Sequence, residues 1–230
     1  MVLCAVLAWL VASQTRQTHE YSDPIRIMAL GDSITQGHTH SYRQPLWLAL
    51  RAAGMQVDFV GSLDRTHAAD GPAQDYDSDH EGHWGWRGDQ VLERIDGWAQ
   101  QAAPDVVLIH LGTNDLRMGK SPRQTTRDVL RIIDRLRAHN PRVHVLVASI
   151  IPVADGRATE LFKQYNQELS ALARRADLAG SRVFLVDQFK GFDPTLDTYD
   201  GVHPNERGSD KMAAKWFAGM QALLPDELPR

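Results

Sequence analysis

Short apolar runs alternate with amphipathic segments along most of this chain. Each apolar run is rich in Val, Ile and Leu and is closed by Gly, Asp or Pro, which is typical of a buried β-strand that ends in a turn. The runs that predict strands are residues 25–30, 57–60, 105–111, 143–151 and 182–186. Between them, apolar positions recur at helical spacing. The segments that predict helices are residues 45–53, 89–101, 122–138, 159–176 and 206–224.

This alternation of strands and helices predicts the fold class. Strands that are apolar on both faces are buried on both faces, as in a parallel sheet that helices cover on either side. We therefore expect an α/β fold, a three-layer α/β/α sandwich around a central parallel five-stranded sheet. In such sheets ligands bind beyond the carboxyl ends of the strands, so catalytic residues are expected in the loops that follow those ends.

Composition and charge exclude several kinds of partner. The 230 residues fit one α/β domain with tails, and 43% hydrophobic and 23% charged residues are near the averages for globular proteins. A net charge of −4 without a long basic run argues against a nucleic-acid partner and gives no attraction to anionic membranes. We expect a small-molecule or polysaccharide substrate and a monomeric protein.

The N-terminal segment, residues 1–20, contains an apolar stretch that is much shorter than the roughly 20 residues needed to span a bilayer. The stretch and the polar residues after it resemble a secretory signal peptide, although no Lys or Arg precedes them. We expect a secreted or periplasmic protein; the alternative, an N-terminal helix or a misassigned start codon, would leave it cytoplasmic. The single cysteine, Cys4, lies in this stretch, so a cleaved protein would have no thiol nucleophile.

The first predicted strand is followed by a serine at a strand-to-helix turn. Residues 31–37 read Gly-Asp-Ser-Ile-Thr-Gln-Gly, which places the Ser33 hydroxyl beyond the edge of the sheet. Ser33 can act there as a nucleophile; the alternative is that Asp32 and Ser33 only cap a helix. The Gly-x-Ser-x-Gly elbow of α/β-hydrolases is not met, because Thr35 replaces its second glycine.

Two later segments offer the groups that a serine nucleophile needs. Asn114 follows the third strand, and its amide is a donor of the kind that stabilises an oxyanion, unless it only organises its own turn. Asp200 and His203 lie three positions apart before the last helix, where one turn can present a base and its carboxylate; a simple helix entry is the alternative. The convergence of all these groups on one sheet edge favours catalysis.

Four blocks of the sequence resemble those of the SGNH, or GDSL-type, hydrolase superfamily, in the expected order. They are residues 31–33 (Gly-Asp-Ser), Gly85, residues 112–115 (Gly-Thr-Asn-Asp) and residues 200–204 (Asp-Gly-Val-His-Pro). The resemblance spans residues 24–225, which we take as the hydrolase domain, and implies the flavodoxin-like SGNH fold. Within the superfamily, residues 79–86 (Asp-His-Glu-Gly-His-Trp-Gly-Trp) are similar to acetyl xylan esterases of carbohydrate esterase family 3.

The resemblance also implies a role for each motif residue. It implies that Ser33 is the nucleophile, that His203 is the base, and that Asp200 orients His203. It further implies an oxyanion hole formed by Ser33, the backbone N–H of Gly85 and the side chain of Asn114. We therefore predict a Ser-His-Asp serine esterase that needs no cofactor.

The block around Gly85 departs from the family pattern. Trp84 stands where a smaller residue is expected, which affects the acyl pocket, and Gly82 and Gly88 are alternatives to Gly85 as the donor. The indole faces of Trp84 and Trp86 suit sugar rings, with packing under a long loop as the alternative.

The predicted reaction is hydrolysis of short-chain acetyl esters of a carbohydrate such as xylan, through an acyl-enzyme intermediate. A lipid- or thioester-directed hydrolase of the same superfamily is the first alternative, because it would differ only in the acyl pocket and the loops that line the cleft. A glycan-binding module without turnover is the second.

The long irregular segment, residues 62–84, contains residue types that bind metals in other proteins. Residues 80–83 (His-Glu-Gly-His) lack the i, i+4 histidine spacing of a helical zinc site, so we expect none. Aspartates alternate over residues 75–79, but His80 and Trp86 stand where an EF-hand needs glycine and glutamate. A structural calcium ion of another geometry stays open.

Overall fold

The computed structural model describes residues 23–71, 73, 75–178 and 183–223. The predicted signal segment, residues 1–20, with Cys4 lies outside the described residues. Within the part of the chain that is described, no helix is long and apolar enough to cross a membrane.

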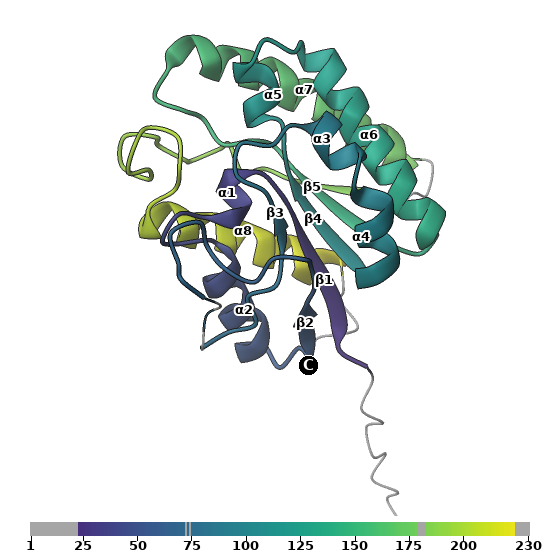
Figure 1. Cartoon of the computed structure of the whole chain (residues 1–230). Coiled ribbons are helices and arrows are strands. Elements are labelled where there is room, and N and C mark those ends of the chain that lie inside the picture. Colours follow the sequence, from purple (N-terminus) through teal and green to yellow (C-terminus); the bar gives the residue numbers. More distant parts are fainter. Residues whose placement is uncertain (1–22, 72, 74, 179–182, 224–230) are drawn as a thin grey trace, which may run out of the picture.

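A parallel sheet forms the middle layer of the molecule (Figure 1). Its strand order is β2-β1-β4-β5-β6, and each of these pairings is parallel. The strands are β1 (Ile25–Gly31), β2 (Val57–Phe59), β4 (Val106–His110), β5 (His144–Ala148) and β6 (Val183–Val186). All five predicted strands are therefore present, and the predicted α/β fold class is confirmed.

A sixth, two-residue strand was not predicted. This strand, β3 (Glu81–Gly82), pairs in parallel with the end of β1 at Leu30 and Gly31. It lacks an apolar run because it consists of one glutamate and one glycine. Its position next to the end of β1 brings the block around Gly85 to the carboxyl edge of the sheet.

Helices cover both faces of the sheet (Figure 1). Along β4, Val107 and Ile109 join one hydrophobic cluster and Val106 and Leu108 the other, because successive strand residues point to opposite faces. The first cluster is covered by α3 (Gly88–Leu92), α4 (Ile95–Ala102), α6 (Pro122–His139) and α7 (Gly156–Leu178). The second is covered by α2 (Arg43–Ala52) and α8 (Glu206–Leu223).

The prediction of one continuous helix over residues 89–101 is wrong. The segment forms two helices, α3 and α4, which are separated by a turn at Glu93 and Arg94, where φ of Arg94 is −119°. Val91 and Ile95, on either side of the break, are both fully buried. Two further short helices, α1 (Ser33–Gln36) and α5 (Thr113–Arg117), follow β1 and β4 and begin at the carboxyl edge of the sheet.

Candidate active site

Ser33 is the first residue of α1, directly after the end of β1. The side chain of Asp32 caps this helix by accepting a hydrogen bond from the backbone N–H of Ile34 (2.9 Å). The alternative capping role therefore applies to Asp32, whereas the Ser33 hydroxyl lies within hydrogen-bonding distance of His203. Gly31 is required at the strand end, because a Cβ there would lie 2.4 Å from the carbonyl oxygen of His110.

Ser33, His203 and Asp200 form a continuous hydrogen-bonded chain. Ser33 Oγ lies 2.9 Å from His203 Nε2, and Asp200 Oδ2 lies 2.7 Å from His203 Nδ1. A carboxylate only accepts hydrogen bonds, so Nδ1 carries the imidazole proton and Nε2 accepts from the Ser33 hydroxyl. This arrangement can deprotonate a serine during attack on an ester.

The turn that carries Asp200 and His203 lies between β6 and α8. Asp200 Oδ1 accepts from the backbone N–H groups of Val202 (2.9 Å) and His203 (2.7 Å), which fixes the carboxylate in the turn. Partial burial opposes ionisation of Asp200, but the hydrogen bonds from His203 and Val202 outweigh it and lower its pKa. Asp200 is therefore ionised at neutral pH and can stabilise a charged imidazole.

The glycines around β3 differ in whether their backbone N–H groups are engaged. The N–H of Gly82 donates to His80 Nδ1 (2.9 Å), and that of Gly88 donates to the Asp115 carboxylate (3.0 and 3.1 Å). Gly85 is exposed, has a φ of 77°, and would have no atom within 4 Å of an added Cβ. These contacts favour Gly85 over Gly82 and Gly88 as the glycine with a free donor.

Asn114 is held against the segment that carries Gly85. Its Nδ2 donates to the carbonyl oxygen of Trp86 (3.0 Å), and because an amide nitrogen has two hydrogens, a second donor remains. On the other side of Gly85, the His83 N–H donates to the carbonyl of Gly31 (3.0 Å). The nucleophile turn, the Gly85 segment and α5 are thus tied together at one edge of the sheet.

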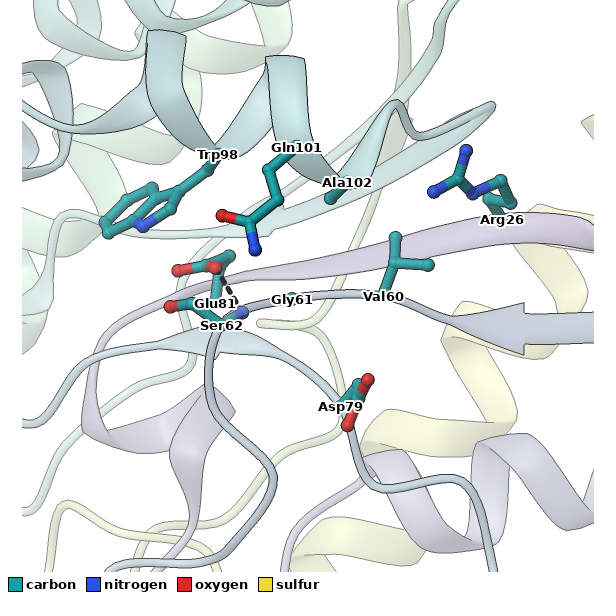
Figure 2. A pocket seen from close by; sticks show the side chains of 9 residues that line it. All are labelled: Arg26, Val60, Gly61, Ser62, Asp79, Glu81, Trp98, Gln101 and Ala102. Carbon is teal, nitrogen blue, oxygen red and sulfur yellow. Dashed lines mark hydrogen bonds between the residues drawn. The ribbon is translucent and has the colours of Figure 1, made fainter.

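A partly buried contact between His83 and Glu81 lies behind the Gly85 segment. His83 Nε2 lies 2.8 Å from Oε2 of Glu81, whose side chain is 1% exposed. The His83 ring stacks on Trp86 and Trp98, with centroid distances of 4.4 and 4.7 Å. Figure 2 shows Glu81 and Trp98 on the wall of a neighbouring cavity of about 190 Å³, where the backbone of Ser62 donates to Glu81. Glu81 and His83 therefore support the loop that carries Gly85.

His80, Asp75 and Asp77, which the sequence also offered as metal ligands, have partners of their own. His80 is buried; its Nδ1 accepts from Gly82 and its Nε2 lies 2.9 Å from the carbonyl of Arg65. Asp75 accepts from Gln44 and Asp77 from the backbone of Phe59, each at 2.6 Å. Among the described residues, no group of three or more His, Cys, Asp or Glu side chains is arranged to hold a metal ion.

Trp84 and Trp86 have different surroundings. Trp84 stacks on His203, with ring centroids 4.7 Å apart and planes 18° apart, and also on His67 at 4.2 Å. Trp86 instead packs on His83 and the hydrophobic cluster under α3 and α4. Trp84 therefore lies beside His203. Trp86 instead takes part in the packing that was the alternative to sugar binding.

Three rings near His203 were not predicted as site residues. Tyr199 lies nearly parallel to His203, with centroids 5.8 Å apart, and His38 lies 5.6 Å from Tyr199 and 5.9 Å from Trp84. His67 reaches Trp84 because its N–H donates to the carbonyl of Gly37 (2.8 Å), which joins two loops. We call His38, His67, Trp84 and Tyr199 the aromatic wall.

The buried carboxyl of Asp32, beside Ser33, makes stability depend on pH. Burial raises the pKa of Asp32 to about 7, although the hydrogen bond from Ile34 opposes the rise. The folded protein then holds this proton more tightly than the unfolded chain, so the stability contributed by Asp32 is present below pH 4 and is lost as the pH rises to 7. The loss is up to about 4 kcal/mol.

Asp32→Asn keeps a capping side chain and removes the charge. We expect the free energy of unfolding of the variant, relative to wild type, to increase between pH 4 and pH 7.5, measured by urea denaturation. Asp134→Asn, at an exposed position on α6, is the control and should leave the pH dependence unchanged. Parallel pH profiles for Asp32→Asn and wild type would contradict the prediction.

Comparison with known proteins connects this site to esterases. Residues 29–211 match the GDSL-like Lipase/Acylhydrolase family model. The structure is similar to a carbohydrate esterase family 3 from Talaromyces cellulolyticus, at 32% identity and a TM-score of 0.78, covering 88% of this chain and 99% of that one. It is also similar to a Clostridium thermocellum family 3 carbohydrate esterase, at 33% identity and a TM-score of 0.77, covering 88% and 98%.

A curated relative is a multidomain esterase of Ruminococcus flavefaciens, 30% identical over 224 residues. The match covers 87% of this chain but 29% of that protein. The chain thus spans less than a third of the length of this relative.

Proposed function

The chain belongs to the GDSL-like lipase/acylhydrolase family and is a carboxylic ester hydrolase, and from this premise we propose that it removes acetyl groups from acetylated carbohydrate such as xylan. The single observation that carries the proposed mechanism is the hydrogen-bonded chain from Ser33 through His203 to Asp200.

The proposed reaction has two stages that use the same groups. Ser33 attacks the ester carbonyl while His203 Nε2 takes its proton, and the resulting oxyanion is bound by the N–H groups of Ser33 and Gly85 and by the Asn114 amide. His203 then donates its proton to the leaving alcohol, which leaves an acetyl ester on Ser33. Water deprotonated by His203 attacks this ester and releases acetate. These steps need no cofactor.

Two observations support an acetyl carbohydrate ester as the substrate. The solved structures reported above at 32–33% identity are carbohydrate esterases of family 3. In addition, the Trp84 ring packs on His203 and immediately precedes Gly85, which limits the space beside the reacting carbonyl. A small acyl group fits this restriction better than the long acyl chain of a lipid.

The substrate proposal is tested by acetate release from acetylated xylan, beside hydrolysis of acetyl and octanoyl model esters. Acetate release with a preference for acetyl over octanoyl esters is the expected result. A preference for octanoyl esters with no acetate released from xylan would favour the lipid- or thioester-directed alternative. Binding of xylan without hydrolysis of any ester would favour the glycan-binding alternative.

Removing the proposed Asn114 donor should slow the chemical step. We expect Asn114→Ala to lower kcat by about 10²- to 10³-fold with little change in KM, because the oxyanion forms only in the transition state. Asn140→Ala is a matched control, since Asn140 donates a side-chain hydrogen bond to Pro104 at the far end of α6. Comparable kcat values for the two variants would contradict a role for Asn114 in the oxyanion hole.

A further inference from the structure

The position of His203 fixes where the alcohol part of the ester must lie. In the proposed reaction, His203 Nε2 protonates the leaving oxygen, so that oxygen has to come within hydrogen-bonding distance of this nitrogen. The sugar attached to the oxygen then lies next to the rings that surround His203. Those rings are Trp84 and Tyr199.

Tyr199 is the more accessible of the two rings. It is 50% exposed, whereas Trp84 is partly buried and already stacks on two imidazoles. The Tyr199 ring plane lies 16° from that of His203. The backbone N–H of Tyr199 donates to the backbone carbonyl of His203 (3.1 Å). A bridge between Thr198 and Pro204 closes the same turn, so Tyr199 and His203 are held in one short segment.

The chemistry of this ring suits a sugar. An aromatic face packs against the C–H groups of a pyranose, and a phenol hydroxyl can donate to or accept from its hydroxyl groups. Partial burial and the neighbouring Asp200 carboxylate raise the pKa of Tyr199, so its hydroxyl stays protonated. His38, with its centroid 5.6 Å from that of Tyr199, supports the ring from the opposite loop.

We propose that Tyr199, supported by His38, forms the subsite for the sugar ring that carries the scissile acetyl group. This inference rests on the proposed carbohydrate esterase function and adds a residue that selects the alcohol. Tyr199 acts on substrate binding, whereas Ser33, His203 and Asp200 carry out the chemistry.

The test compares two esters that share an acetyl group and differ in the alcohol. For Tyr199→Ala we expect the KM for acetylated xylo-oligosaccharides to rise about tenfold, with kcat/KM for ethyl acetate within about twofold of wild type. Tyr199→Phe keeps the ring and should retain most of the affinity for the sugar ester. Leu196→Ala is the control, because Leu196 is 54% exposed on the same loop and should leave both substrates unaffected.

Each other outcome has a distinct meaning. Unchanged KM for the sugar ester in Tyr199→Ala would overturn the subsite. An equal loss on both esters would also overturn it, since it would mean that Tyr199 supports His203 rather than the sugar. Hydrolysis of ethyl acetate by wild type without acetate release from the oligosaccharides would refute the carbohydrate substrate itself, before any variant is compared. Equal unfolding temperatures of wild type and Tyr199→Ala exclude a folding defect.

Discussion

Ser33→Ala should lower kcat for ester hydrolysis by about 10⁴- to 10⁶-fold, because the variant loses the proposed nucleophile, which forms the acyl-enzyme intermediate. The variant should fold normally. The cap of α1 is supplied by Asp32, and the Ser33 hydroxyl contributes a hydrogen bond to His203 alone among the contacts described. The measurement is initial rates of acetate release from acetylated xylan and from an acetyl model ester.

The Ser33 prediction can be separated from a loss of structure. Ser170→Ala, on α7, is a matched serine control that removes only a contact with Arg174 and should keep wild-type rates. Retained affinity of Ser33→Ala for the substrate would show that the site is intact. Turnover of more than about a hundredth of the wild-type rate would mean that another group is the nucleophile.

The sequence predicts the main layers of this fold because their signal is local. The strands come from short runs rich in Val, Ile and Leu, and β4 is the clearest case, because every one of its residues is buried. Elements of two to five residues are too short to show a repeating pattern, so β3, α1 and α5 were not predicted as elements. The break at Arg94 was missed because Val91 and Ile95 fit one helical stripe in sequence.

The site residues, too, could be predicted from the sequence only where the signal is local. Four site residues could be predicted because each lies in a motif next to a predicted strand or helix. They are Ser33, Asn114, Asp200 and His203. The contact between Glu81 and His83 could have been predicted, because residues two apart on an extended segment face the same side. That prediction would have required β3 to be predicted first.

Apart from Trp84, the residues of the aromatic wall could not be predicted from the sequence pattern. His67 and His38 are brought together by backbone hydrogen bonds from His67 to Gly37 and from Ala68 to His38, at 2.8 and 2.9 Å. Every residue except proline can make such bonds, so they leave no mark in the sequence. Tyr199 lies one residue before Asp200, yet only the three-dimensional turn shows its ring beside His203.

Asp200→Asn should lower kcat by about 10³- to 10⁴-fold while preserving the turn. An asparagine oxygen can still accept from the N–H groups of Val202 and His203, as Asp200 Oδ1 does. Its amide nitrogen, however, would face Nδ1 of His203 as a donor. Nδ1 would then have to accept, and the imidazole proton would move to Nε2, where it blocks transfer from Ser33.

The side chain of Asp200 is 40% exposed, and this exposure determines how large the loss of kcat in Asp200→Asn should be. Water can reach the carboxylate and partly replace its charge stabilisation, so we expect a loss nearer 10³-fold than 10⁴-fold. Asp193→Asn, in the same loop, is the matched control and should change kcat by less than about twofold. A loss below about tenfold for Asp200→Asn would show that the tautomer of His203 is fixed by another group, and the triad would then reduce to a Ser33–His203 pair.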